Sequence, residues 1–90
     1  MNEETRATKV YIKDLAPIEA LDEIERYKLP TPHREILITL VKGKEGYPAC
    51  DYLAKEFQIH IGYWSYIKRL EEALIMFRKS KSYIQNLYNN

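Results

Sequence analysis

The stretch that most constrains the fold runs from Tyr47 to Ile75, YPACDYLAKEFQIHIGYWSYIKRLEEALI. Its pattern predicts two short helices joined by a tight apolar turn. Pro48 suits the first turn of the earlier helix, because proline there loses no hydrogen bond. Gly62 lies in the turn and can take backbone conformations that other residues avoid. The inward stripe of the first helix is expected to contain Leu53, Ala54 and Phe57.

The second of these helices has a clear apolar stripe and an opposite polar face. Trp64, Ile67, Leu70 and Leu74 follow one another at spacings of three, three and four, which predicts that they are buried. The opposite face is predicted to carry Tyr63, Ser65, Tyr66, Lys68 and Arg69. A helix with aromatic, hydroxyl and basic side chains on one face fits the major groove of DNA. The stretch therefore has the pattern of a DNA-binding helix-turn-helix.

Two further helices are predicted upstream. Pro17 begins the first, in which Ile18, Leu21 and Ile24 follow at helical spacing. Thr31-Pro32 is a start signal for the second, and Gly43 ends it. Residues 1–9 are unpatterned and are expected to form a frayed arm, while residues 10–15 fit either a short strand or a helical turn.

The charges are unevenly distributed along the chain. Residues 1–40 contain six basic and eight acidic side chains, whereas residues 41–90 contain eight basic and five acidic ones. The positive half therefore coincides with the helix-turn-helix pattern, which favours contact with DNA. The acidic half is left free to bind a partner protein.

Several other classes of protein are disfavoured by the sequence. The single Cys50 cannot form an internal disulfide, and His33 and His60 are too few for a metal cluster, so we expect no cofactor. No nucleophile, base and oxyanion set is recognisable, which argues against an enzyme. We expect a cytoplasmic protein, because the chain contains neither a membrane-spanning run nor a secretory signal.

The run REILITLVKGKEGYPACDYLAKEF, followed by YIKRLEEALI, resembles a winged helix-turn-helix, and Gly46-Tyr47 is similar to the PadR-like branch of that family. The resemblance covers about residues 32 to 85. It implies a mainly α fold with a small β-hairpin, the wing, after the recognition helix. Carried onto this chain, it places Ser65, Tyr66 and Arg69 against bases, and Lys79 and Lys81 on the wing. The expected organisation is an N-terminal arm and dimerisation helix over residues 1–30 and the winged helix-turn-helix over residues 31–90.

An all-α alternative remains open. The family usually has a glycine before the first wing strand, whereas Ala73 here runs directly into Leu74-Ile75. Apolar residues also continue at alternating spacings of four and three, as in a coiled-coil seam, which predicts one long C-terminal helix. That seam would contain Tyr63, Ile67, Leu70, Leu74, Phe77, Lys81, Ile84 and Tyr88.

The function expected from these patterns is sequence-specific binding of double-stranded DNA, by a small transcriptional repressor or a plasmid partition protein. One module of this size buries little DNA, so we expect a homodimer on a palindrome with half-sites about 34 Å apart. Its dimerisation surface is predicted around Ile18, Leu21 and Ile24. The alternative is a protein-interaction module that uses the same helical surface.

Overall fold

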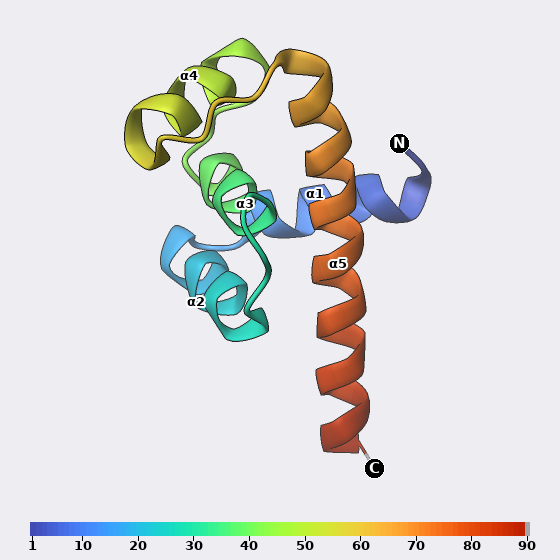
Figure 1. Ribbon diagram of the computed structural model, residues 1–90. Coiled ribbons are helices and arrows are strands. Elements are labelled where there is room, and N and C mark those ends of the chain that lie inside the picture. Colours follow the sequence, from blue (N-terminus) through green and yellow to red (C-terminus); the bar gives the residue numbers. More distant parts are fainter. Residues whose placement is uncertain (90) are drawn as a thin grey trace.

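The computed structural model describes residues 1–89, which form α-helices and no β-strand (Figure 1). The helices in chain order are α1 (Glu3–Asp14), α2 (Pro17–Tyr27), α3 (His33–Val41), α4 (Tyr47–Phe57) and α5 (Tyr63–Asn89). The predicted β-hairpin wing is therefore wrong, and the all-α alternative fits the structure.

Helix α5 runs through the residues predicted to form the wing, because its sequence contains no residue that commonly ends a helix. Gly62 is the last glycine and Pro48 the last proline of the chain, so no residue that commonly breaks a helix follows Tyr63. Leu70, Leu74 and Phe77 are all buried on one side of α5, and packing of this stripe stabilises the helix well past residue 74.

The first helix begins earlier than the sequence pattern suggested. The side chain of Asn2 caps α1 by accepting a hydrogen bond from the backbone N–H of Thr5, at 2.8 Å. Glu3 and Glu4 then lie in the first turn, where negative charge interacts favourably with the helix dipole. The expectation of a frayed arm over residues 1–9 is wrong, and residues 10–15 are helical up to Asp14.

The predicted helices of the middle of the chain are confirmed, with small shifts of their ends. Helix α2 begins at Pro17 as expected, and α3 begins at His33, just after Pro32. Gly43 follows α3 with a φ of 80°, a left-handed conformation that favours glycine. Helix α4 has Pro48 in its first turn.

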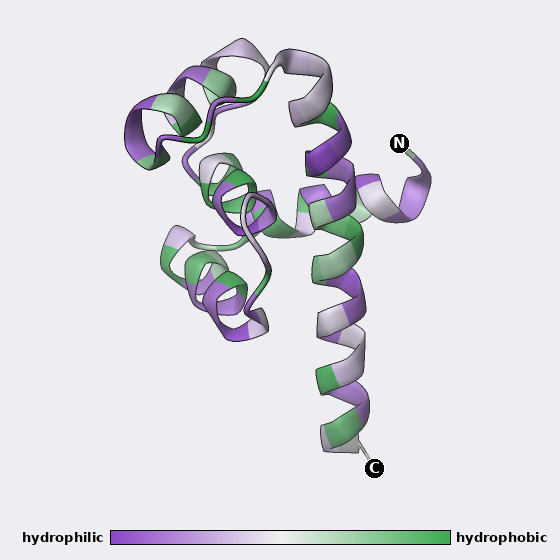
Figure 2. Cartoon of the chain, viewed as in Figure 1, coloured by the Kyte–Doolittle hydropathy of each residue, from purple (hydrophilic) through white to green (hydrophobic). Residues whose placement is uncertain are grey.

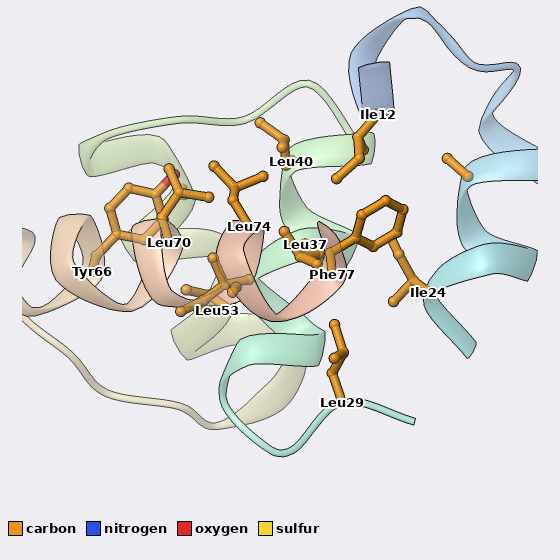
Figure 3. Packing of buried hydrophobic residues seen from close by; sticks show 14 residues of the cluster. Ile12, Ile24, Leu29, Leu37, Leu40, Leu53, Tyr66, Leu70, Leu74 and Phe77 are labelled. Carbon is orange, nitrogen blue, oxygen red and sulfur yellow. The ribbon is translucent and has the colours of Figure 1, made fainter. Parts of the chain in front are cut away.

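Helix α3 lies at the centre and contacts each of the other helices (Figure 1). Leu74 and Phe77 of α5 lie close to Leu37 of α3, and Leu53 of α4 and Ile24 of α2 complete the core at its two sides (Figure 3). The N-terminal helices thus share one core with the helix-turn-helix.

The molecule is elongated, with extents of 42 × 26 × 22 Å, because α5 continues past the packed helices at its C-terminal end (Figure 1). Within residues 1–89, no helix is both long and apolar enough to cross a membrane.

Candidate nucleic-acid interface

Helices α4 and α5 are joined by the turn of residues 58–62. Helix α4 ends where Gln58 takes a left-handed conformation, with a φ of 56°. The carbonyl of Leu53 accepts a hydrogen bond from the backbone N–H of Ile59 at 3.1 Å, which closes the end of α4. Leu53 is itself buried, together with Leu70 of α5. This pairing fixes α4 and the first turns of α5 as one helix-turn-helix unit.

An exposed aromatic group, formed by Tyr47, Tyr63 and Trp64, lies where α4 and α5 begin. Gly46 precedes it with a φ of 66°, and this left-handed conformation brings Tyr47 beside α5. The ring of Tyr47 stacks on that of Tyr63, with centroids 4.8 Å apart, and Trp64 meets Tyr63 edge to face at 5.1 Å. Tyr47 is 70% exposed and Trp64 is 80% exposed. Tyr63 between them is half-buried, so the rings hold one another in place while Tyr47 and Trp64 remain open to solvent.

The sequence pattern assigned Trp64 and Tyr66 to the wrong sides of the helix. Trp64 was expected in the core and is outside, whereas Tyr66 was expected to face bases and is only 1% exposed. Burial raises the pKa of Tyr66 to about 12. Tyr66 occupies the core because the stripe that packs on α3 and α4 continues through Leu70 and Phe77, at spacings of four and seven.

The polar residues of the predicted DNA-binding face differ in solvent exposure and in ion pairing. Ser65 and Lys68 are exposed, and no ion pair engages Lys68 among residues 1–89. Arg69 is half-buried and donates to Glu72 at 2.8 Å. The Nε2 atom of His33 also lies 3.0 Å from Glu72. These bonds, first from His33 and then from Arg69, hold the pKa of Glu72 at about 2, so Arg69 is engaged within the fold.

The charge around the aromatic group is positive. Residues 42–70 contain five basic side chains against three acidic ones, and no acid lies between Glu56 and Glu71. One of those acids, Glu45, is paired with both Lys9 and Lys13 of α1, which adds two further positive charges to this side. The third turn of α5 begins with Glu71 and Glu72, which line the same surface hollow as Trp64 and Lys68, so the positive surface is confined to the first two turns and is bordered by acids.

Lys79 and Lys81, the predicted wing residues, lie on α5 far from this surface. At 1.5 Å per residue, Lys79 is about 22 Å along the helix axis from Trp64. Lys81 donates hydrogen bonds to the hydroxyl of Tyr11 at 2.8 Å and to Glu23 at 3.2 Å. Lys81 therefore links α5 to α1 and α2, and the structure does not bring it together with Ser65 and Lys68.

The predicted dimerisation residues are divided between surface and core. Ile18 is 81% exposed, Leu21 is half-buried and Ile24 is fully buried within the single chain. Of the three, only Ile18 is fully available to a partner.

Groups suited to other chemistry are sparse in the described part of the chain. No cluster of His, Cys, Asp and Glu that could hold a metal ion occurs within residues 1–89. Burial raises the pKa of the Cys50 thiol, which lowers its fraction of reactive thiolate.

Comparison with known proteins found no match: no protein-family model, no curated protein and no solved structure matches this chain.

Proposed function

We propose that this chain binds double-stranded DNA through the first two turns of α5, which we call the recognition face and define as Tyr63, Trp64, Ser65 and Lys68. The observation that carries this proposal is the exposure of Trp64, Ser65 and Lys68, with the half-buried Tyr63 beside them, on the second helix of a helix-turn-helix. In DNA-binding helix-turn-helix units, the N-terminal residues of the second helix contact base edges in the major groove.

Neighbouring groups supply the phosphate contacts that such docking needs. The first helix of the motif crosses the DNA backbone, and the start of α4 lies beside the recognition face, where Tyr47 stacks on Tyr63. Lys44 precedes α4 and lies over the ring of Tyr52, with its Nζ atom 5.7 Å from the ring centroid. Cationic groups such as Lys44 and Lys68 make binding favourable and dependent on salt.

The biological role that fits is that of a small regulator in the cytoplasm, either a transcriptional repressor or a plasmid partition protein. Both roles need a compact chain that occupies a DNA site. A homodimer on a palindromic site increases the buried surface, because a single module of this size covers little DNA.

Selection of bound sequences from a random duplex pool tests the proposal, followed by titration of the selected duplex at two salt concentrations. Trp64 is the single tryptophan, so its fluorescence reports directly on the recognition face. We expect affinity to fall as salt rises, and Lys68→Ala to reduce the steepness of that fall by about one released ion. Lys79→Ala is the matched control on the same helix and leaves binding unchanged. The absence of any duplex binding at low salt would exclude the proposed function.

A second candidate is a protein-interaction surface. Exposed tryptophan and tyrosine side chains are typical of the residues that dominate binding between proteins, and Tyr47 and Trp64 have this character. Binding of this kind depends on buried aromatic area, so it would be far less sensitive to salt than contact with phosphates.

A further inference from the structure

The exposed ring of Trp64 has no function within the described fold. Its side chain is 80% exposed, so it adds little to the core. Yet its position is fixed, since Tyr63 supports it edge to face and Tyr47 stacks behind Tyr63. A large apolar side chain held in place and left in water is suited to contact with an apolar group of a ligand.

We propose that Trp64 recognises the C5-methyl group of thymine in the major groove; this inference rests on the proposed function. The edges of the bases in that groove present hydrogen-bond donors and acceptors and one apolar group, the thymine methyl. Tryptophan offers a single N–H donor and an apolar ring, so it cannot make the paired hydrogen bonds that read guanine or adenine. The match of shape and polarity is therefore between the ring and the methyl group.

The neighbours of Trp64 support the same geometry. Ser65 and Lys68 are exposed beside it and can bond to adjacent base edges or phosphates. Arg69, the residue best suited to guanine, is engaged by Glu72. The recognition face is thus poor in groups that read guanine and rich in apolar ring surface, which predicts a site that contains thymine opposite Trp64.

Replacing thymines of the selected duplex, one at a time, with deoxyuridine tests the inference. Deoxyuridine pairs normally and retains O4, so it removes the methyl group alone. We expect one replacement to weaken binding of the wild-type protein about fourfold, the factor that corresponds to one buried methyl-sized group. The Trp64→Ala variant binds more weakly and no longer distinguishes the two duplexes. Tyr88→Ala, at the other end of α5, retains the full distinction.

The outcomes of this experiment distinguish a failure of thymine recognition by Trp64 from a failure of DNA binding itself. Wild-type protein that binds the duplex but tolerates every deoxyuridine equally overturns the role of Trp64 and leaves the function intact. A Trp64→Ala variant that still distinguishes the duplexes also overturns it. No binding to any duplex excludes both.

The other end of α5 carries an independent observation. Residues 83–88, which we call the C-terminal segment, follow the contacts of Lys81 with α1 and α2 and extend past the packed helices, and apolar residues continue along them (Figures 1 and 2). Tyr83 and Leu87 are exposed on one side, and Tyr88 is 87% exposed beside them. Tyr83 and Leu87 are four residues apart, and so are Ile84 and Tyr88, as on a helix that packs against another helix.

We infer that the C-terminal segment packs against α2 of a second copy of the chain. No acid occurs from Ala73 to Asn89, and two of the three basic residues there, Arg78 and Lys81, are paired with Glu4 and Glu23 of the same chain. Lys79, just before the segment, has no ion pair among residues 1–89. The outer surface of α2 is complementary, because it exposes the apolar Ile18. It also carries the exposed acid Glu19, which no ion pair engages among residues 1–89, whereas Asp22 and Glu25 are paired with Arg26 and Arg34.

A twofold arrangement makes this contact twice. The C-terminal segment of each copy lies on α2 of the other, so exposed apolar side chains meet at both sites. The proposed homodimer interface is therefore formed by surfaces whose apolar side chains are exposed to solvent in the single chain.

Sedimentation of the full chain over a range of concentrations tests the interface. We expect a wild-type dimer that Leu87→Glu and Ile18→Glu each convert to monomer, whereas Trp64→Glu leaves it intact. Mixing the two monomeric variants restores dimers, because one of the two contacts is then unmodified. The inference is overturned if the wild-type chain stays monomeric, or if Ile18→Glu leaves the dimer unchanged. Loss of the dimer in Trp64→Glu alone would place the interface at the recognition face instead.

Discussion

The two ends of α5 both expose aromatic side chains, yet they differ in what surrounds them. At the first end, Trp64 packs edge to face on Tyr63, which in turn stacks on Tyr47 of α4. At the last end, Tyr83 and Tyr88 extend from a helix that has left the core. Rings that are fixed in place suit recognition of a ligand with a defined shape. Rings on an extended helix suit packing against another helix, which would itself order them.

The largest expected effect on stability distinguishes the buried side of α5 from its exposed side at the N-terminal end of the helix. Tyr66→Ala removes a buried ring and should lower the free energy of unfolding by about 3–5 kcal/mol. Trp64→Ala changes an exposed ring and should lower it by no more than about 0.5 kcal/mol. Chemical denaturation followed by circular dichroism measures both. Equal losses would contradict the placement of these residues on opposite sides of α5.

The next largest effect tests whether the C-terminal end of α5 is helical. Ser80→Pro removes a backbone donor within α5 and should destabilise the helix around it by about 3 kcal/mol. Ser80→Ala is the matched control and should leave the helix as stable or slightly more so. Hydrogen exchange of the amides after residue 80 reports the result. Unchanged protection in the proline variant would indicate a turn at this position.

A smaller effect concerns the contacts that hold α5 to the N-terminal helices. Glu23 accepts hydrogen bonds from Tyr27 at 2.7 Å, from Tyr11 at 2.9 Å and from Lys81 at 3.2 Å. Burial alone would raise its pKa, but these bonds outweigh burial and lower it. Glu23→Ala leaves the partners without an acceptor and should cost about 1–3 kcal/mol of stability. Asp22→Ala, on the same helix but exposed, should cost under about 0.5 kcal/mol when measured in the same denaturation series.

The smallest effect is a dependence on pH at the first end of α5. The pKa of Glu72 is lowered to about 2 from an ordinary value of 4.5, first by the His33 bond and then by Arg69. Its ionised form therefore contributes to stability fully above pH 4.5, and this contribution is lost as pH falls toward 2. Glu72→Gln should flatten the decline of stability over this range, and Arg69→Ala should flatten it in part. Identical acid melting curves for all three proteins would contradict the contact.

Proline and glycine explain why the middle helices could be predicted. Pro17 begins α2, Pro48 lies in the first turn of α4, and Gly43 follows α3, each with a local backbone reason that needs no tertiary contact. The absence of glycine and proline was equally informative, since neither residue type occurs after Gly62 to interrupt α5. The start of α1 was missed, although Asn2 followed by Glu3 and Glu4 is a cap signal.

The side of α5 that faces the core could not be fixed from periodicity. A stripe through Trp64, Ile67 and Leu70 and one through Tyr66, Leu70 and Phe77 are both compatible with a helix. The choice depends on where α3 and α4 lie, which is a property of the whole fold. The proposed site therefore stays at the start of α5, while the residues assigned to its exposed face changed.

Mapping the duplex onto the protein by NMR tests most directly whether the first end of α5 is the DNA-binding end. The selected duplex is titrated into ¹⁵N-labelled protein, and backbone and indole N–H signals are followed. We predict that the Trp64 indole signal and the amides of residues 63–68 shift on binding, while those of residues 83–88 remain in place. Shifts gathered at residues 83–88, with the Trp64 signal unchanged, would contradict the assignment of DNA binding to the recognition face.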